Sequence, residues 1–127
     1  MNLSQEQRES IIKISIGYLR REREVGFSCV DFVRLVYRQI GIDIPLLMPK
    51  LPPPSEINIK REDLGFLPLG EIIFLRDRSD GRPRPWTHVG IVYSPFEIIH
   101  CSLFFGGCVV ITPIQLIWER YDFVESL

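Results

Sequence analysis

The stretch Gly26-Phe27-Ser28-Cys29-Val30-Asp31-Phe32-Val33 decides the fold that we expect for this chain of 127 residues. Ser28 is a favoured helix N-cap, and Asp31 three residues later forms a capping box with aspartate in place of glutamate. Apolar residues then recur on one helical face until a glycine, at Phe32, Val33, Val36, Tyr37, Ile40 and Gly41. The pattern predicts a helix whose first residue is Cys29. Unpaired N–H groups and the positive end of the helix dipole favour a thiolate there, which indicates a nucleophilic cysteine.

The composition indicates a single globular domain that spans residues 1–127. Hydrophobic residues make up 46% and charged residues 24%, and the net charge is −1, so neither nucleic acid nor an anionic membrane is expected as the main partner. Three cysteines argue against a disulfide scaffold, although one Cys101–Cys108 bridge stays open. The N-terminus lacks the features of a signal peptide and no apolar run is long enough to cross a bilayer. We therefore expect a cytoplasmic protein, with export by another route as the alternative.

Two helices are predicted in the first part of the chain. Ser4 and Gln7 form a capping box, and apolar residues at helical spacing follow to about residue 22. The helix that begins at Cys29 comes next. The proline-rich run 45–54 then excludes helix and central strand, and we interpret it as a surface connection.

From Gly70 onward the sequence favours strands. Apolar, turn-bounded runs predict them over residues 71–76, 86–93, 97–102, 108–111 and 121–124. Thr112 and Pro113 are expected to cap a helical turn that continues to Trp118. The three-residue link 94–96 makes the second and third strands an antiparallel hairpin. Helices first and an antiparallel sheet second predict an α+β domain.

The hairpin carries both histidines of the chain, His88 and His100. With the turn near residues 94–96 they come close to facing each other, with their side chains on one face of the sheet. One imidazole can then act as a general base that the other orients through a hydrogen bond. With Cys29, the residues predict a nucleophile, a base and an orienting group.

Each of these residues also has a plainer interpretation. A cysteine at a helix start is commonly a small buried residue, and a strand histidine is commonly part of the core or surface. His88, His100, Cys101 and Cys108 are all of zinc-ligand type, but they lack ligand spacing, so we predict no metal and no cofactor. The arginines Arg78, Arg82 and Arg84 are interpreted as a solvated loop.

The order of these motifs resembles the NlpC/P60 family of cysteine peptidases, which have a compact papain-like fold. Four segments carry the resemblance: residues 27–45 around the nucleophile, 67–75 at the turn into the first strand, 87–93 around His88 and 98–102 around His100. The resemblance covers roughly residues 10–125. It implies a papain-like domain whose N-terminal helices pack on a mostly antiparallel sheet.

The resemblance also implies the roles of site residues. Cys29 corresponds to the nucleophile, His88 to the general base and His100 to the residue that orients the base. Residues assigned to substrate contact are Tyr18, Ser28, Val30, Asp31 and Trp86. The implied activity is hydrolysis of peptide bonds in cell-wall-type peptides, through a thioester, with a peptide or muropeptide as partner. A non-catalytic binding or assembly module, and an acyltransferase that uses the same thioester, remain as alternatives.

Overall fold

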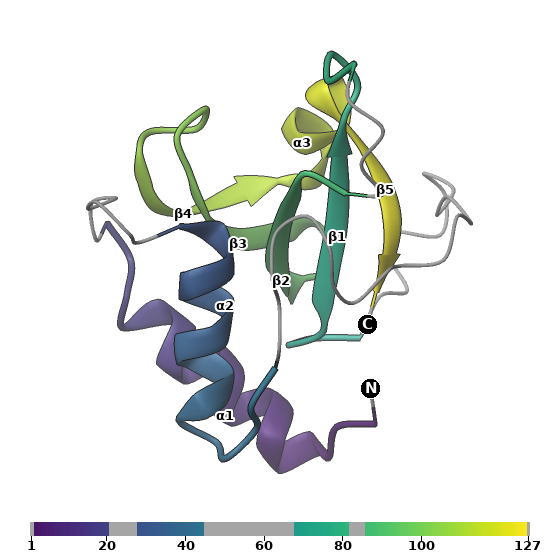
Figure 1. Ribbon diagram of the computed structural model, residues 1–127. Coiled ribbons are helices and arrows are strands. Elements are labelled where there is room, and N and C mark those ends of the chain that lie inside the picture. The colour runs from purple at the N-terminus through teal and green to yellow at the C-terminus, as the bar shows by residue number, and fades with distance from the viewer. Residues whose placement is uncertain (1, 21–27, 45–67, 82–85, 127) are drawn as a thin grey trace.

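The computed structural model describes residues 2–20, 28–44, 68–81 and 86–126 (Figure 1). The elements in chain order are α1 (Gln5–Ile16), α2 (Cys29–Arg38), β1 (Ile72–Asp77), β2 (His88–Ser94), β3 (Glu97–Ser102), β4 (Cys108–Pro113), α3 (Ile114–Arg120) and β5 (Tyr121–Ser126). The strands form one sheet in the order β4-β3-β2-β1-β5, and every neighbouring pair is antiparallel. The predicted α+β class is confirmed. The proline-rich run 45–54 lies outside the described residues.

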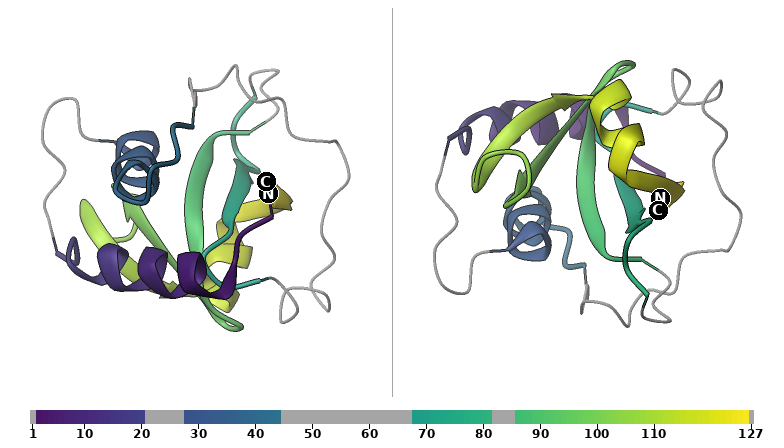
Figure 2. Two further views of the ribbon diagram at one scale, coloured as in Figure 1. Left: turned by 90° about the horizontal axis from the view of Figure 1, so that it is seen from below. Right: turned by 90° about the horizontal axis from the view of Figure 1, so that it is seen from above.

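The sheet separates two apolar clusters. The larger one joins α1 and α2 to one face, with Phe32, Val36, Phe74 and Val89 fully buried among its members. The smaller one joins α3 to the other face, through Ile98 and Ile117 among others. Figure 1 shows α1 and α2 together beside the sheet, and α3 at its far end between β4 and β5; Figure 2 shows the same arrangement from below and above. The chain thus has helices on both faces, and the packing of α2 against β2 and β3 fixes where Cys29 lies.

The turn into β1 is fixed by a buried polar network. Arg8 of α1 donates to the carbonyl of Leu69 at 2.8 Å and forms an ion pair with the buried Glu71 at 3.0 Å. The hydroxyl of Tyr37 donates to the carbonyl of Gly70. Gly70 has a φ of 80°, and a Cβ there would lie 3.4 Å from the backbone of Arg8. Burial and the charge of Glu71 raise the pKa of Tyr37, which stays a neutral donor. The network pins both helices to the start of β1.

Several predicted boundaries differ from the structure, and three of them bear on the site. Helix α1 ends at Ile16 because the chain turns at residues 17–20, where Arg20 takes a φ of 65° and donates its N–H to the carbonyl of Val109 at 2.8 Å. Strand β2 begins at His88, two residues later than predicted. Thr112 is a residue of β4 and does not cap α3, whose N-cap position is Pro113 without a side-chain bond. In the described part of the chain no helix has the length and apolarity that a bilayer crossing requires.

Candidate active site

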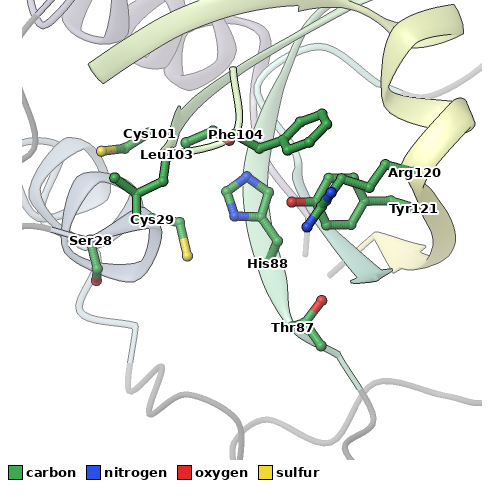
Figure 3. Close-up of a pocket in the computed structure, with 10 residues that line it drawn as sticks. Ser28, Cys29, Thr87, His88, Cys101, Leu103, Phe104, Arg120 and Tyr121 are labelled. Atoms are coloured by element: carbon green, nitrogen blue, oxygen red, sulfur yellow. The ribbon is translucent and has the colours of Figure 1, made fainter. Parts of the chain in front are cut away.

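Cys29 is the first residue of α2, as predicted, and its cap is complete. The hydroxyl of Ser28 accepts from the N–H of Asp31 at 3.3 Å, and the Asp31 carboxylate accepts from the N–H of Ser28 at 2.8 Å. The Cys29 side chain is nearly buried, at 9% exposure, and it opens into a pocket of about 540 Å³. The pocket is lined by Ser28, Cys29, Thr87, His88, Cys101, Ser102, Leu103, Phe104, Arg120 and Tyr121 (Figure 3). The thiol therefore lies at a helix N-terminus and faces a cavity large enough for part of a peptide.

The two histidines are in contact, and a threonine extends the chain of bonds. Nε2 of His88 lies 2.7 Å from Nδ1 of His100, and Nε2 of His100 lies 2.8 Å from the hydroxyl of Thr112. A neutral His100 with its proton on Nε2 donates to Thr112 and accepts from the Nε2–H of His88. The hydrogen bonds thus run across β2, β3 and β4 and engage His88 through Nε2, not through Nδ1.

The contact between the histidines is diagonal, whereas the sequence predicted nearly opposite positions. The register pairs Ile91 with Ile99, and a bulge between Val92 and Ser94 sets this offset. Carried one residue on, the register places Gly90 opposite His100. A Cβ on Gly90 would lie 2.8 Å from Cγ2 of Ile98 and 3.1 Å from Cβ of His100. The absence of a side chain at position 90 therefore lets the two imidazoles approach each other.

His100 is fully buried, and its environment keeps it neutral. Burial, and then the neighbouring His88, hold the pKa of His100 well below its ordinary value. A neutral imidazole retains a lone pair on Nδ1, so it accepts a hydrogen bond from His88 even when His88 is protonated. A residue that orients a general base must accept its hydrogen bond in both protonation states of the base, and a neutral His100 can do so.

Tyr121 and Arg120 form the other wall of the pocket. The ring of Tyr121 stacks on that of His88 with centroids 5.5 Å apart and planes 23° apart. Figure 3 shows the His88 imidazole between the Cys29 side chain and the Tyr121 ring, with Arg120 beside Tyr121. Burial raises the pKa of Tyr121, while a hydrogen bond and the charge of Arg120 oppose this shift. The phenol remains protonated beside the candidate base.

The residues predicted to contact substrate divide between pocket and core. Ser28 lines the pocket, but the Asp31 carboxylate is occupied by the helix cap and is not among the described lining residues. Val30 is 6% exposed within the core. Tyr18 bonds to Gln39 and packs on Phe32, away from the lining set.

Trp86 is a correction to the sequence interpretation. Its side chain is 0% exposed and packs on Phe74 with ring centroids 5.1 Å apart. A fully buried indole contributes to the core and has no surface to offer a substrate.

Sequence reasoning missed several residues of the pocket and of the hydrogen-bonded chain. Thr112 was expected to cap a helix. Had it been assigned to the fourth strand, the predicted pairing of the third and fourth strands would have placed it near His100. Tyr121 and Arg120 had no local signal, because they reach the site through pairing of β5 with β1, where Tyr121 lies opposite Asp77. Cys101 and Ser102 lie at the end of β3, next to the start of β2. Cys29 and Cys101 are both buried thiols.

No group suited to a metal ion is found where the structure describes the chain. There, no three His, Cys, Asp or Glu side chains come together as ligands would. Both ring nitrogens of His100 are hydrogen-bonded, one to His88 and the other to Thr112, so neither is available to bind a metal ion in this arrangement.

Comparison with known proteins identifies the fold. No protein-family model matches the sequence, and no curated protein matches it. Among solved structures, an NLP/P60 family protein similar to lipoprotein from Staphylococcus aureus superposes with a TM-score of 0.69 at 16% identity, and covers 98% of this chain and 43% of its own. This chain has the NlpC/P60 fold.

Two further structures support that assignment. An NlpC/P60 family protein from Bacillus cereus has a TM-score of 0.69 at 20% identity, over 94% of this chain and 40% of its own. NlpC1 from Trichomonas vaginalis has a TM-score of 0.73 at 17% identity, over 98% of this chain and 45% of its own. The chain thus spans less than half the length of these NlpC/P60 proteins, and identities this low establish the architecture alone.

Proposed function

We propose that this chain is a cysteine hydrolase, a peptidase or amidase, that uses Cys29 as nucleophile, His88 as general base and His100 as the residue that orients His88. The observation that carries the proposal is the shared pocket. A thiol at the N-terminus of α2 and an imidazole at the start of β2 open into one cavity, and the imidazole is held at 2.7 Å by a second, buried imidazole. Thiol, base and orienting group are the three parts that nucleophilic catalysis requires.

The route of the proton depends on which ring nitrogen of His88 is already hydrogen-bonded. Because Nε2 of His88 is bonded to His100, the proton of Cys29 passes to Nδ1 of His88. The thiolate attacks the amide carbonyl carbon, and the oxyanion is stabilised by the Cys29 backbone N–H at the helix N-terminus. His88 then gives its proton to the departing amine, and a thioester remains. Water attacks the thioester while His88 accepts its proton, which releases the acid and restores the thiol.

His100 acts in this scheme through His88. Its neutral Nδ1 accepts from His88, and its own N–H is bonded to Thr112, so its ring cannot rotate without loss of a buried bond. The imidazolium that forms on His88 is thereby stabilised and kept oriented toward the thiolate.

The substrate class proposed is a peptide of the cell-wall type. The support is the fold shared with NlpC/P60 proteins together with a pocket of about 540 Å³, which is the size of a small peptide segment. This chain spans less than half the length of those proteins, so the proposal concerns the shared domain alone.

The decisive test is the pH dependence of Cys29 alkylation. We expect Cys29 to react rapidly with iodoacetamide below pH 7, and His88→Ala to shift its reactivity to the alkaline range of an ordinary thiol, about pH 8.5. Cys101→Ser is the matched control, because it removes a second buried thiol from the same pocket wall and should leave the profile of Cys29 in place. An ordinary thiol profile in the wild-type protein would refute the proposal and favour a binding module.

A second measurement addresses the products. Incubation with a panel of muropeptides, followed by mass analysis, should give fragments that have gained one water. Fragments joined instead to an added amine, such as glycine amide, would identify an acyltransferase that uses the same thioester.

A further inference from the structure

The pocket beside Cys29 has a marked charge asymmetry. Among the described residues that line it, Arg120 is the one with a permanently charged side chain, and none is a carboxylate. The remaining lining residues are apolar or neutral, apart from His88, which gains charge during the reaction. A substrate that enters this pocket therefore meets a cation with no acidic group among these lining residues.

Arg120 is held in place by neighbours on two sides. Its Nη2 lies 2.9 Å from Oδ2 of Asp77, and its guanidinium carbon lies 3.9 Å from the ring centroid of Phe104. Asp77 is fixed in turn, because its Oδ1 accepts from the N–H and the hydroxyl of Ser79 at 2.9 and 2.7 Å. The guanidinium is thus preorganised, and little side-chain entropy remains to be lost when it binds a ligand.

The hydrogen-bonding capacity of Arg120 is only partly used by the protein. A guanidinium carries five N–H donors in a planar fork. Asp77 and the hydroxyl of Tyr121 each take a hydrogen bond or ion pair from the guanidinium, and Nε is buried with no hydrogen-bond partner among the described residues. The side chain is 35% exposed, and it lines the pocket beside Cys29. Such an arrangement suits a second carboxylate better than it suits a purely structural ion pair.

The rim of the pocket strengthens this interaction. Leu103 and Phe104, in the turn between β3 and β4, are exposed at 66% and 56% and line the same pocket as Arg120. Apolar side chains beside a guanidinium exclude water from a bound anion, which increases the Coulombic attraction between them.

We propose that Arg120 binds a carboxylate of the substrate, so that the pocket selects peptides that carry an acidic group close to the scissile bond. The inference rests on the proposed hydrolase function for its setting and adds the charge of the substrate to it. Arg120 is in this sense a specificity-determining residue, and Asp77 and Phe104 are the residues that position it.

The test uses two alkylating probes that differ only in charge, iodoacetylglycine and iodoacetylglycinamide. The rate at which each modifies Cys29 is followed by mass analysis of the Cys29 peptide. We expect Arg120→Met to lower the ratio of the acid rate to the amide rate by about tenfold, the range of a charge-assisted hydrogen bond. Arg120→Lys should retain part of the ratio, because it keeps the charge but not the fork.

Arg78→Met is the matched control. Arg78 is a nearby arginine that pairs with Asp122 at 2.9 Å and does not line the pocket. The ratio should be unchanged in this variant. An unchanged ratio in Arg120→Met, or an equal fall in Arg78→Met, would overturn the proposal.

Failure of the hydrolase proposal can be distinguished from failure of the proposal for Arg120. If Cys29 reacts with neither probe in the wild-type protein, the thiol is not activated, whatever Arg120 does. Binding is then measured without chemistry, by NMR titration of the Cys29→Ser protein with N-acetylglycine and its amide. Preference for the acid that disappears in Cys29→Ser/Arg120→Met supports the carboxylate site, and equal binding of both ligands refutes it.

Discussion

Replacement of Gly90 by alanine tests whether the contact between the two histidines depends on an empty position in the sheet. The added Cβ would lie 2.8 Å from Cγ2 of Ile98, 3.1 Å from Cβ of His100 and 3.3 Å from the carbonyl oxygen of Ile99. The first distance is shorter than real Cβ contacts allow, and Ile98 and His100 are fully buried, so neither side chain can move into solvent. Overpacking of this kind costs about 1–3 kcal/mol. The free energy of unfolding, measured in urea, should fall by that amount.

The same substitution should affect the chemistry. A shift of His100 moves the hydrogen bond that orients His88, and a small misplacement of a catalytic group costs up to about 100-fold in rate. We therefore expect slower alkylation of Cys29 below pH 7 in Gly90→Ala, by about tenfold or more. The assay is the rate of iodoacetamide modification of the Cys29 peptide.

Gly81→Ala provides the control for both measurements. No heavy atom of the described residues lies within 4 Å of a Cβ built on Gly81. This variant should be as stable as the wild type or slightly more stable, because alanine reduces the entropy of the unfolded chain. If Gly90→Ala matched Gly81→Ala in both stability and alkylation, the diagonal arrangement would not be the reason that the histidines are in contact.

Three further predictions concern buried polar groups. Arg8→Met leaves the 3%-exposed Glu71 without its ion-pair partner and should lower the free energy of unfolding by about 3–5 kcal/mol. The double variant Arg8→Met/Glu71→Gln should recover part of this loss, as measured by urea denaturation. Thr112→Val leaves the buried N–H of His100 unsatisfied and should cost about 1–3 kcal/mol; an unaltered urea midpoint would contradict the bond. His100 has a lowered pKa, so below about pH 6.5 the unfolded state binds a proton that the native state does not. The free energy of unfolding should therefore fall by up to about 1.4 kcal/mol for each pH unit below that value. His100→Gln should flatten the dependence of this free energy on pH between about pH 6.5 and 5.

The parts of the fold that depend on local patterns were predictable. The cap at Ser28 and Asp31 and the apolar face of α2 placed the start of the helix at the correct residue. The third strand has the predicted bounds, Glu97–Ser102, because its turn and its apolar run are adjacent in sequence. The short hairpin link then brought His88 and His100 to one face. These results follow from helical and strand periodicity together with turn chemistry.

The parts that depend on distant pairing were not predictable. Trp86 precedes the strand of the base and has the character of a substrate-contacting residue, yet its burial is decided by Phe74 in another strand. Tyr121 and Arg120 reach the pocket because β5 pairs with β1 and not with its sequence neighbour β4. The offset between the histidines depends on a bulge at residues 92–94, which periodicity alone does not reveal.

The diagonal bond from His88 through His100 to Thr112 has a consequence for how this protein tolerates changes in length. Each member belongs to a different strand, so their geometry depends on strand pairing and not on the segments that join the strands. An insertion at Pro95, before Phe96, whose carbonyl accepts from the N–H of Ile114 at 2.8 Å, leaves the strand pairing intact and makes this turn a suitable place to graft a peptide tag. A one-residue insertion within β3 before His100 turns that imidazole to the opposite face of the sheet, and His88 loses its hydrogen-bond partner.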